Sequence, residues 1–269
     1  MKITQRIHFP ETDSTNSWAL RELDAHRLTA FPTLVTTLRQ TAGRGQKCRT
    51  WHSPDGCLML SLLFEPKRWQ IALAQTPLLG FAAALAILET LTQLLPPEKA
   101  QRLAIHWPND VFCADAENSQ KFRKLAGLLF EGHASGVMVA GIGLNLLNSA
   151  RFAPPELQDF MLSLSDLEPD WIHAPALQTV SVPDPENALP NSLERFLWLF
   201  LAQLDGFLTL LGTRPAEIVR LTDLHCSQKN TLVTLQTPQG QVTGFCSGLA
   251  PDGALLIDGF PHRVGLIHF

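Results

Sequence analysis

The chain has few cysteines, no closely paired histidines and no excess of basic residues. Its five cysteines are an odd number without a C-x-x-C pair, which indicates neither a disulfide framework nor a zinc site and favours a reducing, cytoplasmic location. No two of its nine histidines lie four residues apart, so a metal site built from histidine and cysteine is not expected. The formal net charge of −4 argues against a broad nucleic-acid surface, which would be basic.

Long apolar runs are also missing. The N-terminal residues carry no apolar run of the kind found in a signal peptide. The longest such run, residues 77–88, is well short of the roughly 20 residues that a membrane span needs. We therefore expect this run to form a buried helix and expect no membrane association.

What the chain does contain is the composition of a globular enzyme. Its 269 residues are 45% hydrophobic and 17% charged, enough for one large domain or one domain with a small appendage. From Thr231 onward, short Val/Leu alternations are separated by turn residues, which predicts four or five strands in a small barrel. A domain boundary is expected near residues 212–228.

Apolar periodicity places the other elements. A first strand at residues 3–9 should end at Pro10, and Ser14 or Thr15 should cap a helix that continues to about Leu23. Residues 70–95 predict the best helix, and Asn191 with Glu194 predicts a capping box for a helix through Leu211, with a short helix after Pro215. Strands of one sheet are expected at residues 34–37, 58–64, 103–107, 111–113, 125–130 and 137–146.

Two further segments are expected to be irregular. Residues 114–120 predict a hairpin loop. Residues 151–190, rich in proline, predict an irregular excursion with one short helix.

Polar clusters interrupt this pattern in a definite order. The densest is Gln40 to Trp51, where Gly43-Arg44-Gly45 combines glycines, which let backbone amides approach a ligand, with a cation able to hold phosphate or carboxylate. The other clusters are Glu11-Thr12-Asp13-Ser14-Thr15-Asn16, Trp107-Pro108-Asn109-Asp110, Lys124-Leu125-Ala126-Gly127 and Gly141-Ile142-Gly143-Leu144-Asn145. Together these motifs resemble those of the biotin protein ligase family.

The resemblance implies an α+β fold. Residues 1–212 would form the catalytic domain, a mixed central sheet with helices packed on it, of the class II synthetase-like biotin/lipoate ligase type. Residues 225–269 would form a small SH3-like β-barrel. The pattern begins within fifteen residues of Met1, so no preceding DNA-binding domain and no nucleic-acid partner is expected.

The implied activity is ATP-dependent activation of biotin to biotinyl-5'-AMP, followed by transfer of biotin to a lysine in the carrier domain of a carboxylase. Both reactants of the first step are anionic, and two unit charges about 4 Å apart repel by roughly 4 kcal/mol at an effective dielectric of about 20. Cations must therefore converge on the reacting groups. The resemblance also implies Mg²⁺ and allows a homodimer.

The resemblance distributes roles among particular residues. Catalysis is expected of Lys124 and Arg44. Biotin would be bound by Ser14, Thr15, Asn16, Gln40, Arg44, Gly45, Gln46 and Lys124. Its uncharged ureido ring needs neutral donors and acceptors, which Ser14, Thr15, Asn16 and Gln40 would supply. The nucleotide would be bound by Gly43, Arg49, Trp51, Asn109 and Asn145, and Asp110 would hold the metal.

Ordinary structural explanations remain for several of these residues. Ser14 is also a good helix N-cap, Asp110 a turn residue, Trp51 a core residue, Asn145 a strand end and Lys124 a solvated lysine.

The chain departs from the family pattern at three positions, where Gln46, Cys48 and His106 replace the usual arginine, glycine and lysine. A neutral Gln46 lacks one charge-assisted bond to phosphate, so we hypothesise weaker retention of the adenylate unless Lys47 substitutes. Two other functions stay open at this point: a lipoate or octanoate ligase or transferase, and a non-catalytic relative that binds biotin.

Overall fold

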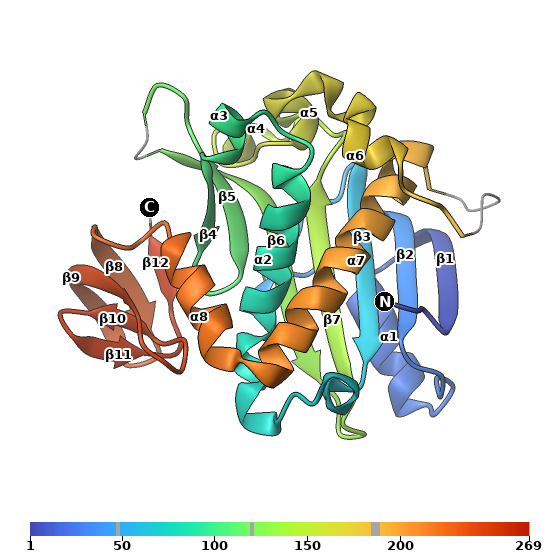
Figure 1. Cartoon of the computed structure of the whole chain (residues 1–269), viewed down its shortest axis with the longest axis horizontal. Helices are drawn as coiled ribbons and strands as arrows, with labels where there is room; N and C mark the ends of the chain where they lie inside the picture. The colour runs from blue at the N-terminus through green and yellow to red at the C-terminus, as the bar shows by residue number, and fades with distance from the viewer. Residues whose placement is uncertain (47–48, 119–120, 184–188, 269) are drawn as a thin grey trace.

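The structure is a computed structural model that describes residues 1–46, 49–118, 121–183 and 189–268. Its centre is a seven-stranded mixed sheet in the order β1-β2-β3-β7-β6-β5-β4 (Figure 1). The strands are β1 (Gln5–Thr12), β2 (Thr33–Gln40), β3 (Cys57–Phe64), β4 (Leu103–His106), β5 (Asp110–Ala114), β6 (Phe122–Gly132) and β7 (Met138–Asn145). β1 and β2 are parallel and every other neighbouring pair is antiparallel. The predicted sheet is confirmed.

Both faces of this sheet are covered. All eight residues of β3 are buried, which explains its unbroken apolar run. Helix α1 (Thr15–Asp24) packs one face through Ala19 and Leu23 against Val35 and Leu63. Helices α2 (Leu79–Thr92) and α7 (Asn191–Thr213) cover the other face and pack against each other side by side (Figure 1). The central strands, with the polar residues that they carry, therefore lie buried between α1 on one face and α2 and α7 on the other.

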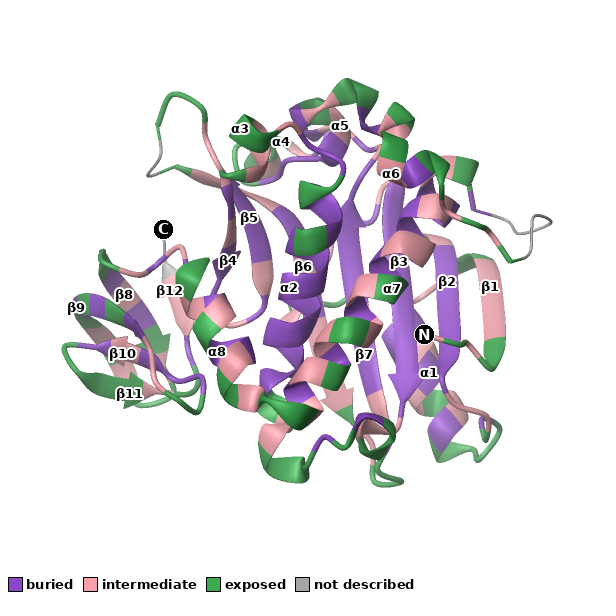
Figure 2. Cartoon of the chain, in the orientation of Figure 1, coloured by how far each residue is buried: buried purple, intermediate pink, exposed green. Residues whose placement is uncertain are grey.

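Two segments, Leu73–Thr92 and Asn191–Thr213, are long and apolar enough to cross a membrane by length and composition alone. In this fold all but two of the 14 residues of α2 are buried, as expected for a core helix. α7 is buried along one face and exposed along the other (Figure 2).

The predicted helix over residues 70–95 begins later than expected. Gln70 has a φ of +59°, a 3₁₀-helix η3 (Leu73–Leu78) follows, and α2 starts only at Leu79. Pro77 explains the delay, because proline lacks an N–H and disfavours helical backbone in the residue before it.

Two local predictions near β1 and α7 were wrong. β1 runs through Pro10 to Thr12, because an edge strand tolerates a residue without an N–H. α7 already starts at Asn191 after Pro190, so no capping box forms. Glu194 instead accepts hydrogen bonds from Arg6 at 2.5 and 2.7 Å, a largely buried ion pair that ties β1 to α7.

The proline-rich excursion contains more regular structure than predicted. Prolines occupy the first helical position of three short elements, where their missing N–H has no helical partner. The described elements are η4 (Ala150–Phe152), α4 (Pro155–Gln158), α5 (Leu164–Leu167), η5 (Pro169–His173) and α6 (Pro175–Gln178). Other short helical elements are η2 (Pro66–Trp69) and α3 (Pro97–Ala100).

The chain ends in helix α8 (Pro215–Leu224) and a second, antiparallel sheet, as predicted. Its five strands lie in the order β11-β10-β9-β8-β12. They are β8 (Leu232–Thr237), β9 (Gly240–Leu249), β10 (Leu255–Ile257), β11 (Phe260–His262) and β12 (Leu266–His268).

The link to this sheet lies against edge strand β4. Ile105 N donates to His225 O at 2.8 Å, and Ser227 N donates to Ile105 O at 3.0 Å. The second sheet is therefore attached beside the turn between β4 and β5.

Candidate functional site

The residues singled out in the sequence surround one cavity of about 480 Å³. It is lined by the start of α1, residues 44–46 and 49–52, the turn between β4 and β5, strands β6 and β7, residues 157, 160 and 161, and β12. Thirteen of the fourteen predicted site residues line it: Ser14, Thr15, Asn16, Gln40, Arg44, Gly45, Gln46, Arg49, Trp51, Asn109, Asp110, Lys124 and Asn145. Lys124 and Arg44 thus share a cavity, as the sequence interpretation required.

Gly43 does not line the cavity but packs behind it. Its carbonyl accepts from Trp51 N at 2.9 Å, and a Cβ there would lie 2.7 Å from Trp51 O. Gly45 N donates to Arg49 O at 2.7 Å, so these bonds fold the loop back on itself. Lys47 and Cys48 lie outside the described residues.

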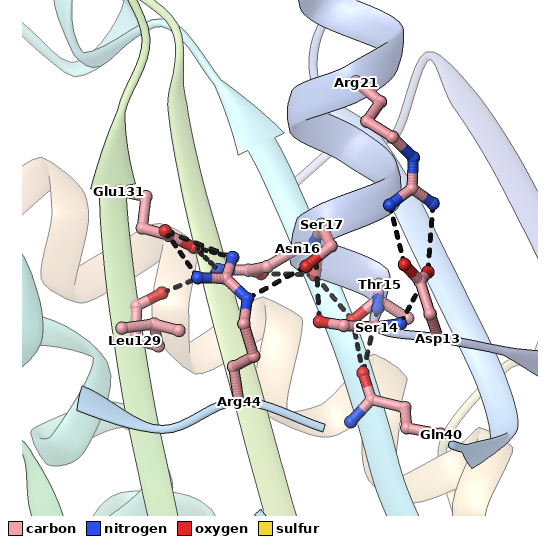
Figure 3. A network of polar contacts seen from close by, with 11 residues as sticks. Asp13, Ser14, Thr15, Asn16, Ser17, Arg21, Gln40, Arg44, Leu129 and Glu131 are labelled. Carbon is pink, nitrogen blue, oxygen red and sulfur yellow. Dashed lines mark hydrogen bonds and ion pairs between the residues drawn. The ribbon is translucent and has the colours of Figure 1, made fainter. Parts of the chain in front are cut away.

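The start of α1 forms a polar end of the cavity (Figure 3). Ser14 is the helix N-cap, as predicted, and accepts from Ser17 N at 3.4 Å. The backbone N–H and the hydroxyl of Thr15 both donate to Gln40 Oε1, at 2.9 and 3.3 Å. Ser14, Thr15 and Asn16 are each only 3% exposed, so capping and cavity lining coexist at the same residues.

The side chain of Asn16 is held by Glu131 and Ser61, which the sequence analysis did not identify, and by the backbone carbonyl of Leu129. Asn16 Nδ2 donates to Glu131 Oε2 at 2.8 Å and to Leu129 O at 3.2 Å, which leaves Asn16 Oδ1 facing Ser61. Ser61 Oγ lies 2.5 Å from that oxygen and 2.7 Å from Thr15 Oγ1. Ser61 is the one hydroxyl in the otherwise apolar β3, a signal that could have identified it from the sequence.

Arg44 reaches the same network from the loop (Figure 3). Its guanidinium donates to both carboxylate oxygens of Glu131, at 3.1 and 2.8 Å, and its Nε donates to Ser17 Oγ at 2.9 Å. Glu131 therefore joins Arg44 to Asn16. Such bidentate arginine–carboxylate pairs hold a side chain in one direction.

Lys124 stands on the other side of the cavity. Its ammonium is 2.6 Å from Asp110 Oδ2 and 5.5 Å from the centre of the Trp51 ring. Its backbone is fixed by the proline-rich excursion, because Lys124 N donates to Phe160 O at 2.7 Å and Leu162 N donates to Lys124 O at 3.0 Å. Phe160 itself lines the cavity and was not predicted.

Glycines in the neighbouring strands make room for the cavity side chains. Gly127 and Gly143 are paired across β6 and β7, and a Cβ on either would lie 2.8 or 2.5 Å from the Trp51 ring. A Cβ on Gly141 would lie 2.5 Å from Asn16 Oδ1. The two glycines of β7 thus leave room for two different side chains of the cavity lining, Gly141 for Asn16 and Gly143 for Trp51.

Two asparagines complete the site. Asn109 donates through its side chain to Leu128 O and accepts from Leu128 N at 3.1 Å, which ties the turn between β4 and β5 to β6. Asn145, at the end of β7, is 4% exposed and donates from Nδ2 to Lys124 O at 3.3 Å.

His106 is buried beside the cavity, where the link to the second sheet packs against β4. Its Nδ1 lies 3.1 Å from Ser227 Oγ and also contacts Gln228 Nε2, while Gln228 Oε1 accepts from Trp107 N at 3.1 Å. Burial, with the nearby charge of Lys124, lowers the pKa of His106 to about 3, so the ring is neutral at pH 7.

The described residues contain no cluster of three or more histidine, cysteine, aspartate or glutamate side chains that could hold a metal. Asp110 is the single carboxylate among the described residues that line the cavity. Mg²⁺ is commonly held by one or two carboxylates together with substrate phosphates. The donor set therefore fits an ion that arrives with a nucleotide and does not fit a resident metal.

Sequence comparisons identify the family and relatives of the chain. The family of biotin/lipoate A/B protein ligases matches residues 8–147. The biotin–[acetyl-CoA-carboxylase] ligase of Paracoccus denitrificans is 31% identical over 256 residues, 92% of each chain. The bifunctional ligase/repressor BirA of Bacillus spizizenii is 34% identical over 84% of this chain but only 61% of its own length.

Structural comparison gives the same fold. The biotin protein ligase from Aquifex aeolicus in complex with biotin and ATP has a TM-score of 0.72 at 23% identity, covering 99% of this chain and 98% of that one. A biotin acetyl coenzyme A carboxylase synthetase from Helicobacter pylori has a TM-score of 0.62 at 19% identity, covering 96% and 98%. This chain belongs to the biotin/lipoate A/B protein ligase family.

Proposed function

We propose that this chain is a biotin–protein ligase that uses ATP to form biotinyl-5'-AMP and then transfers biotin to a lysine of a carboxylase carrier domain. The observation that carries the proposal is that one cavity combines the neutral polar groups of Thr15 and Asn16 with two cations, Arg44 beside them and Lys124 on the other side. A neutral ring attached to a carboxylic acid matches that combination.

The neutral end is suited to the biotin ureido ring. The ring offers one carbonyl acceptor and two N–H donors, and burying any of them unpaired costs about 1–3 kcal/mol. Ser14 and Thr15 supply hydroxyls. Asn16 supplies an amide oxygen as an acceptor, because both of its N–H groups are used by Leu129 and Glu131. Gln40, bound to Thr15, holds this end together.

The cations are suited to the reacting groups. In the first step a carboxylate oxygen of biotin attacks the α-phosphorus of ATP, the bond to the β-phosphate oxygen breaks, and pyrophosphate leaves. Lys124 and Arg44 would offset the repulsion between the two anions and the charge that develops at phosphorus. Both are held by carboxylates here, Lys124 by Asp110 and Arg44 by Glu131, so an anionic ligand would exchange these contacts for its own.

The nucleotide would extend from Lys124 toward Asn145, with Trp51, Arg49 and Asn109 along its path and Gly43 shaping the loop. We place Mg²⁺ at Asp110, together with the phosphates of ATP, where it would neutralise their charge. In the second step the neutral amine of the acceptor lysine attacks the carbonyl of the mixed anhydride, an amide forms and AMP leaves.

The acceptor is proposed from the relative in Paracoccus denitrificans, whose name assigns it to acetyl-CoA carboxylase. We further propose that residues 1–212 carry the chemistry and that residues 225–269 form a separate small domain beside it.

Biotin-dependent exchange of pyrophosphate into ATP tests the proposal. We expect exchange with biotin and none with lipoate or octanoate, and loss of exchange in Lys124→Ala. Exchange with lipoate alone would instead identify a lipoate ligase. Biotin binding without exchange in the unaltered chain would identify a non-catalytic relative.

A further inference from the structure

The side chain of Asn145 is held in one orientation by a chain of hydrogen bonds that starts at a backbone carbonyl. Lys124 O can only accept, and it accepts from Leu162 N at 3.0 Å and from Asn145 Nδ2 at 3.3 Å. Rotating the Asn145 amide by 180° would place two oxygens against each other. Lys124 O therefore favours the orientation in which the amide nitrogen faces it.

Asn148 continues this chain from the other side. Its Nδ2 donates to Asn145 Oδ1 at 3.0 Å. Asn148 is 5% exposed, and its own Oδ1 is buried with no donor in hydrogen-bonding distance among the described residues. A buried acceptor without a partner is unfavourable, so this side chain is poorly explained by packing alone. The hydrogen bond that it donates to Asn145 accounts for an amide side chain at this buried position.

These contacts determine what Asn145 can offer a ligand. One of the two N–H groups on Nδ2 is used by Lys124 O, and one lone pair of Oδ1 is used by Asn148. Cys57 Sγ also lies 3.8 Å from Oδ1, but its single S–H has a nearer acceptor in Leu144 O at 3.2 Å. One donor and one acceptor therefore remain on a side chain that lines the cavity. Their order is fixed, because Asn145 cannot rotate without breaking both contacts.

A fixed pair of one donor and one acceptor distinguishes purines by their substituent at position 6. The amide can accept from the 6-amino group of adenine and donate to ring nitrogen N7, as asparagine does when it recognises adenine in DNA. Guanine and hypoxanthine carry a 6-oxo group, which would oppose the amide oxygen. Only a rotated amide could donate to that oxo group.

We propose that Asn148 is a positioning residue for nucleotide specificity: by donating to Asn145 it selects an adenine nucleotide over a 6-oxopurine nucleotide. This inference rests on the proposed function insofar as it places a nucleotide base at Asn145. It goes beyond that function because it names the interaction that discriminates between purine bases. It also names Asn148, which does not contact the base, as the residue that orients Asn145 for this interaction.

The experiment compares ATP with inosine triphosphate, which carries a 6-oxo group in place of the 6-amino group and a proton on ring nitrogen N1. Affinities are measured by calorimetry with and without biotinol, the alcohol analogue of biotin that cannot be adenylated through an acid. The unaltered chain should bind ATP at least about tenfold more tightly. Asn148→Leu, which keeps the bulk but removes the donor, should reduce this preference about tenfold.

Ser149→Ala is the matched control. Ser149 is the next residue, lines the same small neighbouring cavity as Asn148, and bonds to Asp166 rather than to Asn145. It should keep the full preference for ATP.

Two results would overturn the inference. One is a lack of ATP preference in the unaltered chain, and the other is a parallel loss of both affinities in Asn148→Leu, which indicates a merely structural role. A preference that depends on Asn148 in a chain unable to form biotinyl-AMP would uphold the inference while refuting the proposed function.

Discussion

Gly141 and Gly143 give the sharpest test of how the cavity is built. They lie two residues apart on β7, so their missing side chains face the same way. A Cβ on Gly141 would lie 2.5 Å from Asn16 Oδ1, and a Cβ on Gly143 would lie 2.5 Å from Trp51 Cε2. Favourable contacts between carbon atoms are about 3.5–4.0 Å, so alanine at either position must displace its neighbour by about 1 Å.

The two substitutions should therefore damage different parts of the site. Overpacking of this kind typically costs about 1–3 kcal/mol, which corresponds to roughly 5- to 150-fold in an equilibrium constant. Gly141→Ala should weaken biotin binding within that range, because Asn16 belongs to the neutral end. Gly143→Ala should displace Trp51 from beside Lys124, slow adenylate formation within the same range, and change biotin affinity much less.

Calorimetric titration with biotin and pyrophosphate exchange measure these effects separately. Gly206→Ala is a suitable control, since a Cβ there meets nothing within 4 Å and the residue lies inside α7. Equal losses of biotin affinity in the two β7 variants would refute the reasoning that each glycine seats a separate wall.

Three further predictions follow from single side chains. The pKa of His106 is about 3 in the folded chain and about 6.5 when unfolded, so the unfolded state takes up a proton first and stability should fall as the pH drops from 6.5 toward 3. His106→Asn should flatten that dependence in urea unfolding between pH 4 and 6; an unchanged slope would contradict the assignment. Gln46→Arg should slow release of biotinyl-AMP without acceptor by about tenfold or more, the worth of one charge-assisted bond, and equal release rates would refute the hypothesis of weak retention. Ser61→Ala should raise the dissociation constant of biotin about tenfold, because Thr15 and Asn16 lose a shared partner, and calorimetry showing unchanged affinity would contradict that role.

The sequence predicted the elements well where the signal was local. An apolar run such as Leu58–Phe64 must be buried, and Ser14 before a helical pattern caps it, whatever the rest of the chain does. The start of α7 was mispredicted for the opposite reason. Glu194 was taken as a capping partner of Asn191, but its carboxylate binds Arg6, which is 188 residues away. Local spacing cannot reveal a partner brought in by a distant strand.

The same distinction divides the site. That Arg44 and Lys124 line the cavity was predictable from their own segments, because Arg44 lies between two glycines and Lys124 lies in a segment that resembles a family motif. Glu131 and Asn148 were missed because their roles depend on a second residue. Glu131 acts through Arg44, 87 residues away, and Asn148 through the amide of Asn145, which it holds together with the Lys124 carbonyl. The residues that line the cavity can thus be identified from motifs, whereas the residues that orient them are identified only when the strands are placed side by side. Specificity, which depends on orientation, is therefore the property that most requires the structure.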